Sequence, residues 1–209
     1  MELLERIEKR RFVGREFLLW LWFESEIFEG TLSTKEHGDF GLWIEKQFVV
    51  SEGREVTRIK GSYPAGSREA KESLHRGKMP EVAGLHLSHE GKDTSFALRA
   101  ERMAFAGLSL PSVLGKEEET PVSLAPKAPP RRKKSRREDD ERAESDEAHE
   151  SFYERMHLTK DVEALLEALY RDFLVLRLGS AWDALVVPAI RTWMEKGGEV
   201  DADAYRAAR

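Results

Sequence analysis

The chain contains no cysteine in its 209 residues. This absence excludes disulfide bonds, thiol nucleophiles and thiolate metal sites, and it agrees with a reducing compartment such as the cytoplasm. Long hydrophobic runs are also missing. The most apolar stretch is residues 17–23, whereas a membrane-spanning helix needs about 20 apolar residues. The start of the chain has neither the short basic segment nor the small-residue cleavage site of a signal peptide. We therefore expect a cytoplasmic protein with no membrane partner.

Catalytic motifs are absent as well. The sequence has no glycine-rich phosphate loop, no GxSxG nucleophile motif and no HExxH zinc motif. His86 and His89 are separated by three positions in an expected strand, so their side chains point to opposite faces and cannot easily chelate one metal. The sequence therefore predicts neither an enzyme nor a cofactor or metal site.

Neither sign of charge is in large excess. Lys and Arg together number 34, Asp and Glu number 39, and the formal net charge is −5. Nucleic-acid-binding proteins usually carry a clear basic excess. A basic surface on this chain must therefore come from the local sorting of its charges.

Residues 116–150 interrupt the folded pattern. The segment has four prolines (Pro121, Pro126, Pro129 and Pro130), few large apolar residues and blocks of opposite charge. It buries too little apolar surface to offset the backbone entropy of ordering, which is about 1–2 kcal/mol per residue. We expect a disordered charged linker here, although residues 135–150 can form a transient helix through charge pairs. The expected domains are residues 1–115, this linker, and residues 151–209.

The first domain reads as α+β. Helices are expected over residues 2–12 and 17–26, and Ser67 caps a shorter helix that Gly77 ends. Strand patterns cover residues 40–50, 55–60, 82–89, 94–99 and 102–108. Connections this short favour antiparallel pairing, so the prediction is an antiparallel sheet with packed helices.

Two helices are expected after the linker. Thr159 caps the first and Gly179 ends it, while Ser180 caps the second and Pro188 kinks it. A helical hairpin alone makes a poor core. This C-terminal segment is therefore expected to pack on the first domain, on a third helix or on another chain.

The apolar residues 17–23 have two interpretations. They form either a core helix that covers the sheet or a partner-facing surface that includes Trp20 and Trp22. Large exposed apolar patches mark interaction sites, whereas burial of each such side chain contributes about 1.5–3 kcal/mol to the core.

Basic residues form two candidate nucleic-acid-binding sets. The linker carries Arg131, Arg132, Lys133 and Lys134, which either hold phosphates or are neutralised by the acidic run that follows. The second set lies on the expected sheet, where a basic stripe and an ordinary solvated face have the same pattern. Its members are Arg58, Lys60, Lys78, Arg99 and Arg102.

The segment VTRIKGSYPAGSREAKESLHRGKMPEVAGLHLSHEGKDTSFALRAERMAFAGLSL resembles the C-terminal part of the RdgC family of recombination-associated proteins. GREFLLWLWFESE and HESFYERMHLTKDVEALLEALYRDF are similar to further family segments, so the resemblance covers about two-thirds of the chain. It implies a homodimer that binds duplex DNA with little sequence preference and limits access of the recombinase. Arg58, Lys60 and Lys78 match basic positions of the family pattern. The family's N-terminal half has no counterpart here, and the Pro-rich linker is foreign to the pattern.

Two functions follow as hypotheses. The first is a non-enzymatic, RdgC-like protein that occupies duplex DNA, associates with the nucleoid and modulates recombination. The second is a protein-interaction module whose flexible linker tethers the helical hairpin, without DNA binding.

Overall fold

The computed structural model describes residues 3–109, 137–195 and 199–208. The chain forms two compact units, one of Met1–Ser109 with Leu165–Arg209 and one of Leu110–Ala164. The expected C-terminal segment is thus divided, because its residues from Leu165 onward belong to the same unit as the sheet. That larger unit contains the sheet and every element discussed below except the first part of the long helix α3.

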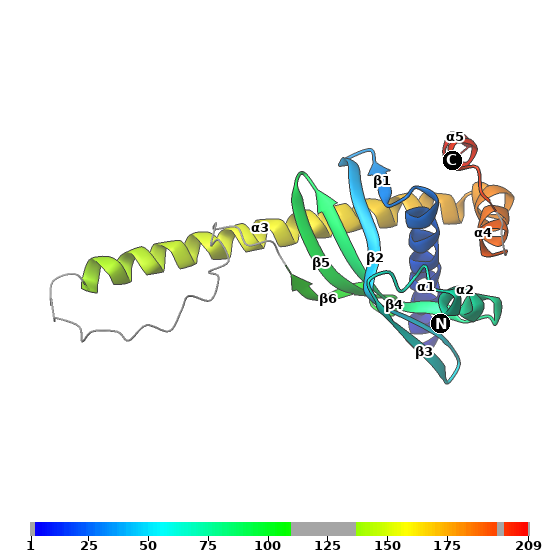
Figure 1. The fold of residues 1–209 in the computed structure, drawn as a ribbon, viewed down its shortest axis with the longest axis horizontal. Helices are drawn as coiled ribbons and strands as arrows, with labels where there is room; N and C mark the ends of the chain where they lie inside the picture. Colours follow the sequence, from blue (N-terminus) through cyan, green and yellow to red (C-terminus); the bar gives the residue numbers. More distant parts are fainter. Residues whose placement is uncertain (1–2, 110–136, 196–198, 209) are drawn as a thin grey trace, which may run out of the picture. The chain divides into compact units, whose positions relative to one another are not determined.

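The antiparallel α+β fold expected from the sequence is confirmed (Figure 1). Six strands form one sheet in the order β1-β2-β4-β5-β6, and β3 pairs with β2 off this path. All of the strand pairs are antiparallel. The strands are β1 (Thr31–Thr34), β2 (Gly38–Glu52), β3 (Glu55–Gly61), β4 (Met79–His89), β5 (Lys92–Arg99) and β6 (Ala104–Ser109).

One helix, α1 (Leu3–Ile27), replaces the two helices expected at the start of the chain. It passes through Gly14 without a break. A Cβ atom on Gly14 would lie 2.0 Å from the carbonyl oxygen of Ala100, so glycine allows the helix to approach the end of β5 closely. Gly14 is therefore a packing residue and not a helix end.

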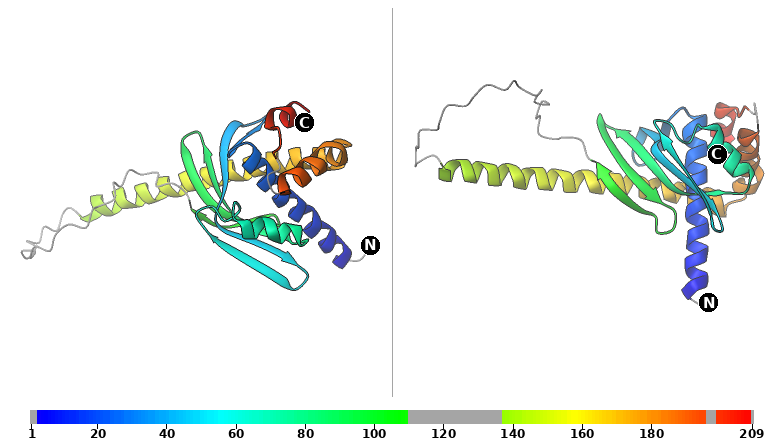
Figure 2. Two further views of the ribbon diagram at one scale, coloured as in Figure 1. Left: turned by 45° about the vertical axis from the view of Figure 1, so that its right-hand side comes forward. Right: turned by 60° about the horizontal axis from the view of Figure 1, so that its bottom comes forward.

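Six of the seven residues 17–23 of α1 are core, with Leu19 partly exposed, and the interpretation of Trp20 and Trp22 as a partner surface is wrong. Trp20 is 1% exposed and Trp22 is 0% exposed. On one side α1 packs on β2 and β4, and on the other side it contacts the C-terminal helices (Figure 2). Trp22 makes both kinds of contact. The centroid of its ring lies 4.7 Å from that of Phe48 on β2 and 4.9 Å from that of Trp193 in the C-terminal helices. A helix buried on both sides needs apolar side chains around its whole circumference.

The C-terminal part consists of helices, as expected, but their ends differ. They are α3 (Arg137–Leu178), the π-helical turn η1 (Trp182–Val186), α4 (Val187–Met194) and α5 (Ala202–Ala208). Thr159 does not cap a helix. It lies within α3, where its hydroxyl donates to the carbonyl of Arg155 at 2.8 Å. Pro188 lies just after the π-helical turn, and Val186 and Val187 have helical backbone angles, so this proline lies inside one continuous helical stretch that departs from the regular α-form just before it.

The helix α3 begins at Arg137 and therefore includes the end of the expected linker. Within residues 137–150, oppositely charged residues stand three or four positions apart in the sequence. This spacing favours a helix. The remainder of the expected linker, residues 116–136, lies outside the described residues, as does the expected domain boundary at Gly115.

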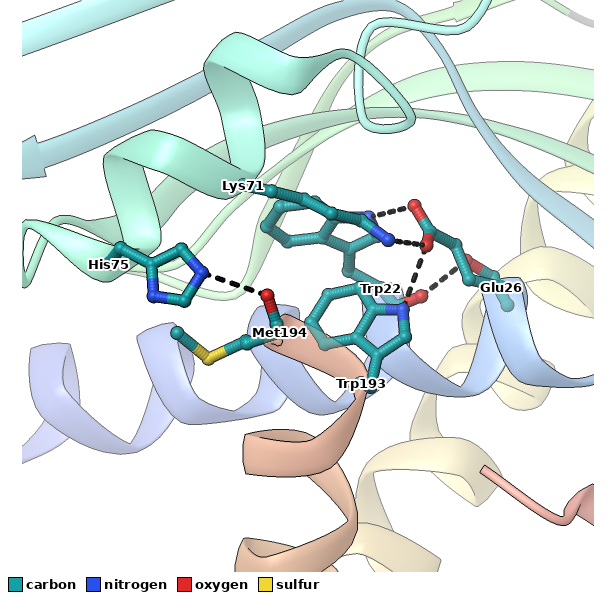
Figure 3. A network of polar contacts seen from close by, with 7 residues as sticks. Trp22, Glu26, Lys71, His75, Trp193 and Met194 are labelled. Carbon is teal, nitrogen blue, oxygen red and sulfur yellow. Dashed lines mark hydrogen bonds and ion pairs between the residues drawn. The ribbon is translucent and has the colours of Figure 1, made fainter. Parts of the chain in front are cut away.

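A carboxylate of α1 ties three helices together (Figure 3). Glu26 accepts hydrogen bonds from the indole nitrogens of Trp22 and Trp193, both at 2.8 Å, and its Oε2 lies 2.9 Å from Nζ of Lys71. Lys71 is on α2 (Arg68–His75), which begins at the Ser67 cap as expected. His75 adds a contact of 2.8 Å to the carbonyl oxygen of Met194 at the end of α4. These bonds fix α2 and α4 against α1.

Candidate nucleic-acid interface

One face of the sheet lies against α1, and among the described residues of the larger unit no helix covers the other, which is called the open face below. Along β2, Phe40, Leu42 and Ile44 are buried on the α1 side, whereas the residues between them are only partly buried. Because side chains of a strand alternate between faces, the register of the strands determines which basic residues share the open face.

Three of the predicted residues share it. Arg58 is opposite Val49, Val49 is opposite Val82, and Val82 is opposite Arg99. Directly opposite residues point to the same side of a sheet, so Arg58 and Arg99 lie at the two ends of one row. Three strand spacings of about 4.8 Å place their backbones about 14 Å apart. Lys60, opposite Gln47, stands in the neighbouring row on the same face. The expected basic stripe is therefore formed in part.

A bulge in β2 adds a further cation to this face. Ile44 is opposite Leu85 and Phe48 is opposite Ala83, so residues 45–47 oppose the single residue Gly84. Lys46 adopts a left-handed backbone (φ 63°) and is exposed. A Cβ atom on Gly84 would lie 2.3 Å from the carbonyl oxygen of Glu45, so only glycine fits beneath the bulge.

A shallow groove crosses the open face beside this bulge. It has a volume of about 280 Å³ and is lined by Lys46, Arg99 and small residues such as Gly84, Ala97 and Ala106. Small side chains leave the strand backbone accessible to a ligand. The groove thus has a cation from each of two strands in its lining, Lys46 from β2 and Arg99 from β5.

The other end of the open face is acidic. His86 lies between two carboxylates, with Nδ1 3.8 Å from Glu45 Oε2 and Nε2 3.6 Å from Asp93 Oδ1. The ring of Trp43 is 5.8 Å from that of His86 and lies over Gly41, where a Cβ atom would come within 2.3 Å of the indole. The open face therefore changes from acidic to basic along the strands.

Two of the predicted sheet residues lie away from this face. Arg102 is exposed in the turn between β5 and β6. Lys78 is only 9% exposed, and its Nζ lies 3.0 Å from Thr57 Oγ1 and 3.2 Å from Glu55 Oε2. Thr57 faces the same side of β3 as the buried Ile59, because these positions are two apart. The turn at Gly77 directs Lys78 beneath the sheet, so the expectation that it joins the basic stripe is wrong.

The linker candidates Arg131, Arg132, Lys133 and Lys134 lie outside the described residues. Lys46 is the residue that sequence reasoning missed. Its one indication in the sequence was Gly84, because an isolated glycine within a strand pattern marks a bulge or a close approach of backbone. Which strand forms the bulge opposite Gly84 can be assigned only when the pairing register of the strands is known.

Among the side chains that the structure describes, two titratable groups have clearly shifted pKa values. Partial burial, and then the charge and hydrogen bond of Glu26, raise the pKa of the Tyr63 phenol above its ordinary range. A hydrogen bond that the Arg177 guanidinium donates to the Glu16 carboxylate raises the pKa of Arg177, so this guanidinium stays charged. Both residues lie by the helices, and neither contributes to the open face.

Within the described ranges, no group of three or more His, Asp or Glu side chains is arranged to hold a metal ion. In the same part of the chain, no single helix has the length and apolar composition of a membrane span, although Phe152–Leu178 and Trp182–Met194, bent by 89°, pass that test as a pair.

Comparison of the chain with protein-family models, with curated proteins and with solved structures gives no match in any of the three.

Proposed function

We propose that the open face of the sheet binds duplex DNA without catalysis and without sequence readout. The observation that supports this proposal is the row Arg58–Val49–Val82–Arg99, with Lys60 beside it and Lys46 raised by the bulge. Four cations drawn from β2, β3 and β5 stand on one exposed surface. Such a surface attracts the phosphate backbone even though the net charge of the whole chain is −5.

The chemistry of these side chains fits phosphates better than bases. Arg donates in a planar fork and Lys acts as a point charge, and both satisfy phosphate oxygens of any sequence. Base readout requires a helix or a ribbon that enters a groove of the duplex. The row of cations here runs across the strands of the sheet, and none of its members stands on a helix. The protein therefore contacts the backbone of the DNA and discriminates little between sequences.

The resemblance to the RdgC family supports the same function. A cytoplasmic, nucleoid-associated homodimer that occupies duplex DNA would modulate recombination by limiting access of other proteins. Glu45 and Asp93, at the acidic end of the open face, repel phosphates. They therefore limit the part of this face that DNA can cover. DNA is expected to lie across the basic end, along the direction of the row.

The test compares charge-removing variants in a duplex-binding assay by fluorescence anisotropy. At about 50 mM salt, replacing Arg58 and Lys60 together by alanine lowers the affinity at least about tenfold, because two phosphate contacts are lost. The matched control replaces Lys35 and Arg191 together by alanine. Lys35 is exposed in the turn after β1, and Arg191 is exposed on α4. The affinity of this control for DNA is expected to change less than about twofold. Equal losses in the two double variants would contradict the assignment of the interface.

Deletion of residues 131–137 in the same assay separates the sheet from the linker. If the sheet provides the interface, the deletion variant keeps the dependence on Arg58 and Lys60. If the linker alone provides it, binding disappears with the deletion and the sheet variants behave as the wild type.

The change of charge along the open face also favours a second candidate, a protein-interaction module. A face with Glu45 and Asp93 at one end and Arg58 and Arg99 at the other suits a partner protein with the reverse arrangement. This candidate predicts no binding of duplex DNA at about 50 mM salt.

A further inference from the structure

The free edge of β1 forms one wall of a cleft that lies away from the proposed DNA-binding residues. The cleft has a volume of about 410 Å³, which is in the range of ligand-binding pockets. Residues 31–35 line one side of it, and Asp172, Val175 and Leu176 of α3 line the other. Phe28 and Arg206 line its remaining surface. All of these residues belong to the larger unit.

The lining shows that the backbone edge of the strand faces the cleft. Successive side chains of a strand point to opposite faces, so the four consecutive residues of β1 can line one cleft only along the edge of the strand. On its other edge β1 pairs with β2, through Thr31 opposite Gly41 and Thr34 opposite Gly38. Within the described part of the chain, no strand pairs with β1 on the cleft side. The N–H of Thr31 donates to the carbonyl of Phe28 at 2.9 Å, and the remaining outward backbone groups of β1 are available to an additional strand.

The opposite wall combines the exposed apolar side chain of Val175 with the buried Leu176 and the partly exposed carboxylate of Asp172. Asp172, Val175 and Leu176 have the i, i+3, i+4 spacing that places side chains on one face of a helix. Val175 remains 70% exposed, although large apolar side chains on this unit are otherwise mainly buried. In a peptide strand that pairs with β1, every second side chain would point toward α3, where Val175 would be covered.

The charges of the cleft favour an acidic ligand. Lys35 is exposed, and Arg206 is held with its guanidinium 4.3 Å from the ring centroid of Phe28. Neither cation has a carboxylate partner among the residues that the structure describes. The acidic residues of the cleft are Asp172 and Glu24, and Glu24 is fully buried and accepts a hydrogen bond from the Tyr205 hydroxyl at 2.8 Å. Two exposed cations therefore face one accessible carboxylate.

We propose that this cleft binds an extended, acidic peptide segment of a partner protein, which adds to the sheet as a strand beside β1. The backbone of the peptide pairs with the β1 edge, its apolar side chains cover Val175 and Leu176, and its acidic groups meet Lys35 and Arg206. This mode of recognition obtains affinity from main-chain hydrogen bonds and specificity from alternate side chains. It is independent of DNA binding, since none of the four cations of the open face lines the cleft.

The test uses the full chain and fluorescein-labelled peptides in an anisotropy assay. The probe is the pentapeptide ELTLE, which alternates apolar and polar residues between two glutamates. Its controls are KLTLK, with reversed charge, and ELPLE, whose proline removes one backbone N–H donor. We expect ELTLE to bind with a dissociation constant below about 1 mM and each control peptide to bind at least about tenfold more weakly.

Variants of exposed residues provide matched controls on the protein. Val175→Glu introduces a charge into the cleft wall and lowers the affinity for ELTLE about tenfold or more. Leu178→Glu changes a side chain that is 83% exposed on the same helix but does not line the cleft, so its affinity stays within about twofold. Lys35→Glu reverses the preference between ELTLE and KLTLK, a result that general destabilisation cannot produce.

Three results would overturn the proposal: no binding of ELTLE up to about 1 mM, equal binding of ELTLE and ELPLE, or equal effects of the changes at Val175 and Leu178. The variant with alanine at Arg58 and Lys60 keeps its affinity for ELTLE whether or not the open face binds DNA. Failure of one proposal can therefore be distinguished from failure of the other.

Discussion

At the scale of single residues, Glu26 joins side chains that are far apart in the sequence. Its carboxylate accepts two indole hydrogen bonds and an ion pair, from Trp22, Trp193 and Lys71. Only 12% of the Glu26 side chain is exposed. A buried donor that loses its partner costs about 1–3 kcal/mol. The polar residues that end the apolar stretch of α1 are therefore structural.

Replacing Glu26 by alanine is expected to lower the free energy of unfolding by about 2–4 kcal/mol, because two indole N–H groups lose their acceptor. Glu26→Gln keeps an acceptor oxygen and is expected to cost less. Urea denaturation measures both effects. Glu163→Ala, at an exposed position of α3, serves as the control and changes the stability by no more than about 0.5 kcal/mol. A similar value for Glu26→Ala would refute the structural role of this carboxylate.

The raised pKa of Tyr63 predicts a loss of stability at alkaline pH. Above pH about 10 the phenol of the unfolded chain releases its proton, whereas the folded protein retains it. The folded state then binds more protons, so the free energy of unfolding falls as the pH rises through this range. Tyr63→Phe removes the contribution. The difference in stability between wild type and variant, measured by urea denaturation, is expected to shrink from pH 9 to about 11; a constant difference would contradict the shift.

At the scale of elements, the bulge of β2 connects sequence to the proposed interface. Residues 45–47 oppose Gly84 alone, and the extra length directs Lys46 away from the sheet. Bulges commonly redirect a side chain beside a functional site. The strand therefore gains a cation on its open face without changing its buried residues.

Gly84→Ala tests the bulge. The added methyl would contact the Glu45 carbonyl at 2.3 Å, so the substitution is expected to cost about 2–3 kcal/mol and to weaken duplex binding. Gly53→Ala is the comparison, since Gly53 has a positive φ of 56° but open space around it, and it costs about 1 kcal/mol. Equal losses of stability in denaturation experiments would show that Gly84 is not under steric constraint.

Most elements of the sheet could be predicted from the sequence, because alternation and turn residues mark them locally. The short strand β1 could not, since TLST contains one large apolar residue and is defined by its pairing with β2. The sequence predicts two helices where α1 is continuous, and only the close approach of Ala100 explains the glycine at position 14 inside it. The sequence predicts Lys78 as a member of the stripe, because its acidic partner, Glu55, becomes a neighbour only in three dimensions. Tertiary contacts decided each of these cases.

At the scale of the whole molecule, function is proposed for surfaces and not for a reaction centre. The larger unit carries two candidate surfaces, the open face of the sheet and the cleft at the edge of β1. The first suits a polyanion and the second an acidic peptide. A protein with both surfaces could hold DNA while it recruits a partner.

The slope of log affinity against log salt concentration for duplex DNA tests the central claim most directly. If Lys46, Arg58, Lys60 and Arg99 each neutralise one phosphate, the slope for the wild type is about −4, and alanine at Arg58 and Lys60 changes it to about −2. The variant with alanine at Lys35 and Arg191 keeps the wild-type slope. Identical slopes for the wild type and the variant at Arg58 and Lys60 would contradict binding through the open face.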